Sequence, residues 1–327
     1  MFDYRPKMFD EASHTHTSKK LISILLSFIA VFAVIFILEG IFPSLTATKP
    51  MLEEMRDKGY LDNTDDFGLK ESMKLATRVS STPSVMLISL YSTIFGTIAA
   101  IFYCRCVEMR PVRSMGARKK GFIPHYLFGL IIGIAMMSAI TLLSVAFGAN
   151  SISRCSNVDY KILVLFLLGF IIQGMSEEFI FRGYLMNSIG GGGHHTAIAV
   201  GISAVAFALA HAVNPGFGIV PFINLTLFGV FAALYVLAFD NIWGICAIHS
   251  IWNFTQGNFY GISVSGSGDT PSVFRTAQIS GKSYLTGGEF GIEGSIFTTL
   301  VLAVGIAITA YAISKKAHKA EPAPQTE

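Results

Sequence analysis

The amino-acid sequence predicts an all-α, polytopic membrane protein with about eight transmembrane helices around a polar cavity inside the membrane. Of the 327 residues, 52% are hydrophobic and only 14% are charged, and the mean hydropathy is +0.57. Soluble globular domains carry about 25% charged residues, so this composition excludes that class. The other two observations are a series of apolar runs long enough to cross about 30 Å of hydrocarbon, and a pair of adjacent glutamates inside one of these runs.

The apolar runs give the order of the predicted helices. They cover residues 21–43, 82–104, 122–148, 160–189, 195–212, 217–239, 241–258 and 292–314. The fifth and seventh runs are short, because a transmembrane helix needs about 20 residues. The first run follows Lys19 and Lys20, and it is longer than the roughly 7–15 apolar residues of a cleaved signal peptide. We therefore predict that it is retained as a membrane anchor.

Basic residues between the second and third runs predict the orientation. Residues 105–120 contain six arginines and lysines and a single acidic residue, Glu108. Loops with such an excess of positive charge remain in the cytoplasm. With an even number of helices, both ends of the chain lie on the same side as this loop. The sequence thus predicts a multi-pass protein of the cell membrane with cytoplasmic N- and C-termini.

Several polar side chains occur within the apolar helices of the second half. They are Glu177, Glu178 and Arg182 in the fourth run, His211 in the fifth, and His249 and Asn253 in the seventh. At 1.5 Å per residue from the predicted cytoplasmic ends, Glu177 lies roughly 18–20 Å deep, His211 about 24 Å, and His249 and Asn253 about 12 and 18 Å. We expect these four side chains to share one layer of the membrane.

The spacing of these residues indicates which role each can have in a reaction. Glu178 and Arg182 are four residues apart and can pair, which lowers the cost of burying both charges. Glu177 points about 100° away from Glu178 and is the freer carboxylate, suited to accept a proton from water. His249 and Asn253 lie on one helical face and can donate hydrogen bonds to a developing oxyanion. Together with His211, these groups predict hydrolysis of an amide bond in a membrane cavity.

Three motifs carry a resemblance to a known family. They are EExxxR (Glu177, Glu178, Arg182), FxxxH (Phe207, His211) and HxxxN (His249, Asn253), in this order on successive predicted helices. They resemble the motifs of the CPBP family, the CaaX-processing and bacteriocin-processing intramembrane endopeptidases, also called the Abi family. The resemblance covers about residues 160–258, roughly a third of the chain.

The resemblance implies a fold, a set of roles and a class of substrate. The implied fold has eight helices, like that of the Ras-converting CaaX endopeptidases, with a conical cavity that opens to the cytoplasm. Glu177 would activate water with His211, His249 and Asn253 would form the oxyanion hole, and Arg182 would order the acidic helix. The implied substrate is a hydrophobic peptide or a membrane-anchored protein, with or without a prenyl group. We expect the lipid bilayer as a partner and no nucleic acid, and the sequence leaves the oligomeric state open.

The predicted organisation has four parts. Residues 1–20 form a cytoplasmic tail, residues 21–150 contain the first three transmembrane helices with a surface loop, residues 151–314 form the CPBP-type protease core with helices four to eight, and residues 315–327 form a basic cytoplasmic tail. Within the surface loop, residues 51–61 and 67–79 are expected as short surface helices.

For three further segments the sequence predicts structure but no function. The Gly190–Gly193 run is expected to form a flexible cytoplasmic turn. Gly129 and Gly133 are spaced for close packing of helices, which we expect within the chain. The connection 260–291, rich in Gly, Ser and Thr, is expected outside the membrane and is longer than a passive turn requires.

Two alternative functions remain at this stage. A metalloprotease could use Glu177, Glu178, His211 and His249 as ligands, and members of the family are often labelled metalloproteases. HExxH is absent, however, and no histidine follows either glutamate at the third or fourth position, so we predict no metal cofactor and keep zinc as the alternative. The second alternative is a non-catalytic scaffold, bacteriocin immunity protein or transporter. No internal inverted repeat supports a transporter.

Overall fold

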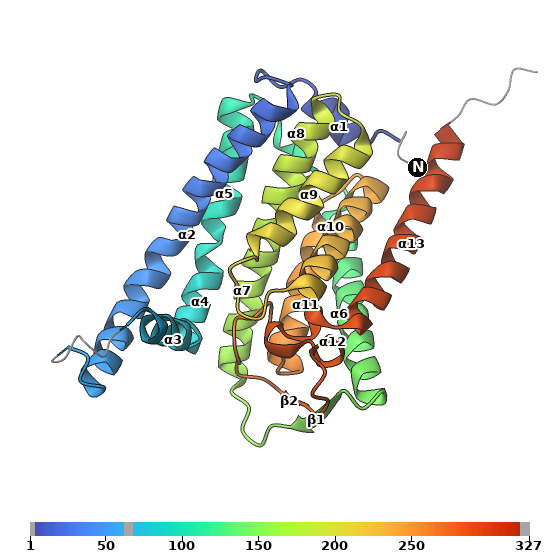
Figure 1. Cartoon of the computed structure of the whole chain (residues 1–327). Helices are drawn as coiled ribbons and strands as arrows, with labels where there is room; N and C mark the ends of the chain where they lie inside the picture. The colour runs from blue at the N-terminus through green and yellow to red at the C-terminus, as the bar shows by residue number, and fades with distance from the viewer. Residues whose placement is uncertain (1–3, 62–67, 321–327) are drawn as a thin grey trace, which may run out of the picture.

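The structure is a bundle of helices with one small two-stranded sheet at its end (Figure 1). It is a computed structural model that describes residues 4–61 and 68–320. The predicted all-α polytopic membrane fold is confirmed. Large apolar side chains cover the outer faces of the helices, and Phe36, Ile131 and Ile308 are 64–69% exposed, as expected for side chains that contact lipid.

Within the described residues, six helical segments are long and apolar enough to cross a membrane. They are α2 (Leu21–Asp57), the segment Pro83–Val107 formed by α4 (Pro83–Ser92), α5 (Ile94–Phe102) and a π-helical turn, α6 (Phe122–Ala146), the segment Tyr160–Gly191 that begins with α7 (Tyr160–Glu178), α10 (Ile219–Phe239) and α13 (Ile296–Ala320). The fifth and seventh predicted runs form α9 (Thr196–Ala210) and α11 (Trp243–Phe254). Both are shorter than a full span, as the sequence indicates.

The first helix is longer than its apolar run. α2 continues through Pro43 and Pro50 to Asp57, so most of the expected surface helix at residues 51–61 is the end of α2. The second expected surface helix is α3 (Leu69–Ser80), which buries Leu75 and Val79 against the end of α2. Residues 62–67, where that prediction begins, lie outside the described residues.

The N-terminal segment also folds onto the bundle. α1 (Lys7–Ala12) lies within the predicted tail, and Met8 and Phe9 are fully buried. The backbone N–H of Met8 donates to Asp240 at 3.1 Å. Gly190 belongs to α8 (Asn187–Gly191), and a Cβ atom there would lie 2.5 Å from the Phe9 ring. Gly190 and Gly191 therefore pack against α1, and only Gly192 and Gly193 form a turn. The flexible turn expected over the whole run is thus limited to its second half.

The connection 260–291, together with the turn Ile292–Gly294 that follows it, forms a folded cap over one end of the bundle. β2 (Phe274–Gln278) pairs antiparallel with β1 (Asn150–Arg154), which was not predicted, and short helical turns follow, including α12 (Ser283–Thr286). Phe290 and Ile292, both within the cap, are fully buried. We call this end of the bundle the sheet end, and the opposite end, with α1, α8 and residues 105–120, the basic end (Figure 1).

Two glycines bring α6 against α11, the helix that carries His249 and Asn253. A Cβ atom on Gly129 would lie 2.2 Å from the carbonyl oxygen of Gly244, and one on Gly133 would lie 2.6 Å from that of Ile248. These approaches leave no room for a side chain. The glycine pair thus mediates packing within the chain, as the sequence analysis predicts.

We expect Gly129→Ala to lower the melting temperature of the protein in detergent. The added methyl group meets a backbone carbonyl that cannot rotate away, and overpacking of this kind costs about 1–3 kcal/mol. The matched control is Gly201→Ala on α9, where a Cβ atom meets nothing within 4 Å. Equal melting temperatures for the two variants would contradict the packing of α6 on α11.

Candidate active site

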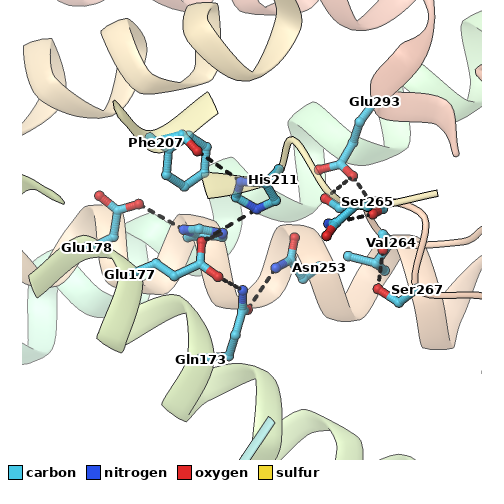
Figure 2. Close-up of polar contacts among 12 residues, drawn as sticks. Gln173, Glu177, Glu178, Phe207, His211, Asn253, Val264, Ser265, Ser267 and Glu293 are labelled. Carbon is cyan, nitrogen blue, oxygen red and sulfur yellow. Dashed lines mark hydrogen bonds and ion pairs between the residues drawn. The ribbon is translucent and has the colours of Figure 1, made fainter. Parts of the chain in front are cut away.

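Polar side chains from three helices meet at one cavity. Glu177 on α7, His211 directly after α9, and His249 and Asn253 on α11 all line a cavity of about 200 Å³. Figure 2 shows Glu177, His211 and Asn253 facing one another. The structure therefore brings together the four side chains that the sequence analysis selected as catalytic candidates.

The two oxygens of the Glu177 carboxylate have different surroundings. Oε2 lies 3.7 Å from Nε2 of His249 and 3.9 Å from Nε2 of His211, separations longer than a direct hydrogen bond. Oε1 accepts a hydrogen bond from the Gln173 side chain. One oxygen is thus anchored, and the other faces two imidazoles across the cavity.

Glu178 and Arg182 form a fully buried ion pair next to the cavity. Arg182 Nη1 lies 3.0 Å from Glu178 Oε1, and both side chains are 0% exposed. The same oxygen lies 2.8 Å from Nδ1 of His249, and because a carboxylate only accepts, Nδ1 carries the hydrogen. Arg182 belongs to the π-helical segment Phe179–Met186 that follows α7. The ion pair predicted from the spacing of Glu178 and Arg182 is present, and it also orients His249.

Phe207 supports both Arg182 and His211. Its ring lies under the Arg182 guanidinium at 4.6 Å from the centroid, a distance typical of a cation–π contact. Its backbone carbonyl accepts from Nδ1 of His211 at 2.9 Å. Nδ1 is therefore the protonated nitrogen of a neutral His211, and Nε2 presents its lone pair toward Glu177.

Gln173 is a member of the cluster that the sequence analysis did not select. Its Nε2 donates to Glu177, and its Oε1 accepts from Asn253 Nδ2 at 2.9 Å. It therefore links α7 to α11. The signal in the sequence is an amide one helical turn before Glu177, within an apolar run.

A further carboxylate lies behind the cluster. Glu39 on α2 approaches α5, because a Cβ atom on Gly96 would lie 2.6 Å from Glu39 Oε1 and 2.5 Å from Ser176 Oγ. Ser176 directly precedes Glu177, and Glu39 lies within electrostatic reach of Glu177. A single acidic residue in the first apolar run was the available signal for this contact, and the sequence analysis did not use it.

The cavity extends from Glu177 toward the sheet end. Its walls come from Phe170 and Gln173 on α7 and from Trp252 and Asn253 on α11, which lie on the sheet-end side of Glu177 and His249. The outer wall comes from the cap, through residues of 264–267 and Glu293. Two predictions from the sequence therefore conflict. If the basic end is cytoplasmic, this cavity does not extend toward the cytoplasm as the family resemblance implies.

The comparison with protein families matches the same region of the chain. Residues 159–255 match the family described as type II CAAX prenyl endopeptidase, Rce1-like. This supports assignment to the CaaX protease (CPBP) family. The matched residues contain all three motifs of the CaaX protease resemblance, and they support a protease that works within a membrane. Searches of curated proteins and of solved structures found no match.

We expect Arg182→Ala to reduce the free energy of unfolding by about 3–5 kcal/mol, because it leaves Glu178 as a buried charge without its partner. The control is Arg78→Ala, which breaks an ion pair with Glu54 in which Arg78 is 61% exposed, and such surface pairs contribute about 0–1 kcal/mol. Thermal unfolding in the same detergent compares the two. An unchanged melting temperature for Arg182→Ala would show that the buried pair is not a stabilising element.

Proposed function

We propose that the protein is an intramembrane endopeptidase that hydrolyses a peptide bond of a hydrophobic or membrane-associated substrate with water activated by Glu177. The observation that carries the proposal is the position of Glu177 Oε2, which faces the Nε2 atoms of His211 and His249 at 3.9 and 3.7 Å within a cavity. The family match over residues 159–255 supports the class of reaction.

The separations around Glu177 suit a water molecule that bridges the polar groups. Glu177 Oε2 and His211 Nε2 both accept, so one water can donate to each and direct a lone pair at the substrate carbonyl carbon. Glu177 takes the proton as the new carbon–oxygen bond forms. The same proton then passes to the amide nitrogen as the carbon–nitrogen bond breaks, which leaves a carboxylic acid and an amine.

Asn253 and His249 are placed to stabilise the oxyanion. Asn253 Nδ2 has two hydrogens and uses one for Gln173, so the second can donate to the carbonyl oxygen as it gains charge. His249 donates through Nδ1 to Glu178, and it donates through Nε2 as well only as an imidazolium. The proposed role of His249 therefore requires its positively charged form.

Glu177→Gln is expected to lower proteolysis by about 100-fold or more while the protein still folds, because the amide keeps the shape but cannot take the proton from water. The measurement is turnover of fluorogenic peptides by purified protein, with the exposed Glu289→Gln as control. Activity within about tenfold of wild type would remove Glu177 from the mechanism. A scaffold or immunity protein, in contrast, would keep its phenotype in this variant.

A metal-dependent reaction with the same residues is the second candidate, since Glu177, His211 and His249 face a common point. In the part of the chain that the structure describes, no group of three or more potential ligands is arranged to hold a metal ion. We expect full activity after treatment with a chelator. One stoichiometric zinc ion, lost together with activity and restoring it on return, would instead assign water activation to a Lewis acid.

We also propose that the protein lies in the cell membrane with both termini in the cytoplasm, because residues 105–120 are strongly basic. The cavity then extends toward the outer face. This orientation favours a hydrophobic peptide that arrives from outside or within the bilayer over a prenylated protein of the cytoplasm.

Two native cysteines test the orientation. Cys106 is exposed at the basic end, and Cys155 is partly exposed beside β1 at the sheet end. A membrane-impermeant maleimide added to intact cells that carry the protein in their cell membrane is expected to label Cys155 and spare Cys106, with Cys155→Ser and Cys106→Ser identifying each signal. The reverse pattern would place the cavity mouth on the cytoplasmic side.

A further inference from the structure

A second acidic side chain lines the cavity opposite the catalytic candidates. Glu293 belongs to the cap, is 7% exposed, and borders the same cavity as Glu177 and His211. Among the described residues it forms no ion pair with a lysine, arginine or histidine. A buried carboxylate without a cation is costly unless other groups stabilise its charge.

Neutral donors hold this carboxylate through one oxygen. Glu293 Oε2 accepts from the backbone N–H and the hydroxyl of Ser265, both at 2.8 Å (Figure 2). The same oxygen accepts from Gln256 Nε2 at 3.2 Å. Within the described residues Oε1 makes no hydrogen bond. The three donors thus fix the orientation of the group and leave one oxygen available to a ligand.

The backbone around Glu293 is fixed as well. Asn224 Nδ2, on α10, donates to the carbonyl oxygens of Glu293 and Ser295 at 2.7 and 2.8 Å. Gln256 also donates to the carbonyl oxygen of Ser263 at 2.7 Å. The carboxylate is therefore held between α10, the turn after α11 and the cap. Gln256, Ser265 and Glu293 lie beyond residues 159–255, so they are not part of the region that matches the CaaX protease family.

We propose that Glu293 binds a positively charged group of the substrate, so that the protease prefers peptides with an ammonium or guanidinium group at a fixed distance from the cleaved bond. The inference rests on the proposed function. A cation binds more strongly to a buried carboxylate on the wall of a small cavity than to one in water, because the surroundings screen the attraction less. The charge can come from a lysine or arginine side chain or from the amino terminus of a peptide.

The test uses fluorogenic apolar peptides in which each position in turn carries either lysine or its uncharged analogue norleucine. With wild-type protein we expect lysine at one position to raise kcat/KM about 10- to 100-fold over norleucine, since a hydrogen bond to a charged group contributes about 1.5–3 kcal/mol. In Glu293→Gln that ratio is expected to fall to about 1. The amide keeps an oxygen for Ser265 and Gln256 but loses the charge. The exposed Glu289→Gln in the same segment is expected to keep the ratio.

A second peptide set has a free or an acetylated amino terminus and identifies the source of the charge. Preference for the free amine shows that the site binds the amino terminus of a peptide, and preference for internal lysine shows that it binds a side chain. Either preference supports the inference if Glu293→Gln abolishes it. Cleavage that depends on Glu177 but shows neither preference would overturn the inference and leave the proposed function intact.

A peptide panel without any cleavage that depends on Glu177 would count against the proposed function. In that case, fluorescence anisotropy measures binding of the lysine and norleucine peptides to wild-type protein and to Glu293→Gln. Tighter binding of the lysine peptide that is lost in Glu293→Gln supports the charged subsite by itself. Equal affinities, or a preference that survives the substitution, overturn it.

Discussion

The buried ion pair between Glu178 and Arg182 is the interaction on which the arrangement of the site depends. Both side chains are fully enclosed, so each needs the other to offset the loss of water. Glu178 also orients His249, and Arg182 lies over the ring of Phe207, whose carbonyl fixes His211. One pair on a single helix thus determines how two histidines from other helices face Glu177.

The sequence was sufficient to predict the features that follow from spacing along one helix. Four-residue spacing predicted the Glu178–Arg182 pair and the shared face of His249 and Asn253, and apolar length predicted the helices. Depth arithmetic predicted that Glu177 and His211 lie in one layer of the membrane, because depth can be counted along each helix separately. These inferences needed no knowledge of which helices are neighbours.

The features that were missed depend on neighbours that a single sequence does not reveal. Gln173 has a role because α11 places Asn253 beside it, and Glu39 approaches Ser176 only because α2 and α5 pack together. The burial of Phe9 requires a glycine on α8 that is distant in sequence. The β1–β2 pairing joins segments more than 100 residues apart, and neither strand is long enough to give a periodic signal.

The hydrogen-bond donors at the cavity limit the form in which a substrate can react. In an α-helix each carbonyl oxygen already accepts from the N–H four residues further along, whereas the proposed reaction needs the carbonyl oxygen to accept from Asn253 and His249. A peptide segment in lipid remains helical because its backbone has no other hydrogen-bond partners there. Under the proposed function, a membrane-embedded substrate must therefore unwind before cleavage, so glycine and proline, which weaken helices, would make a segment easier to cut.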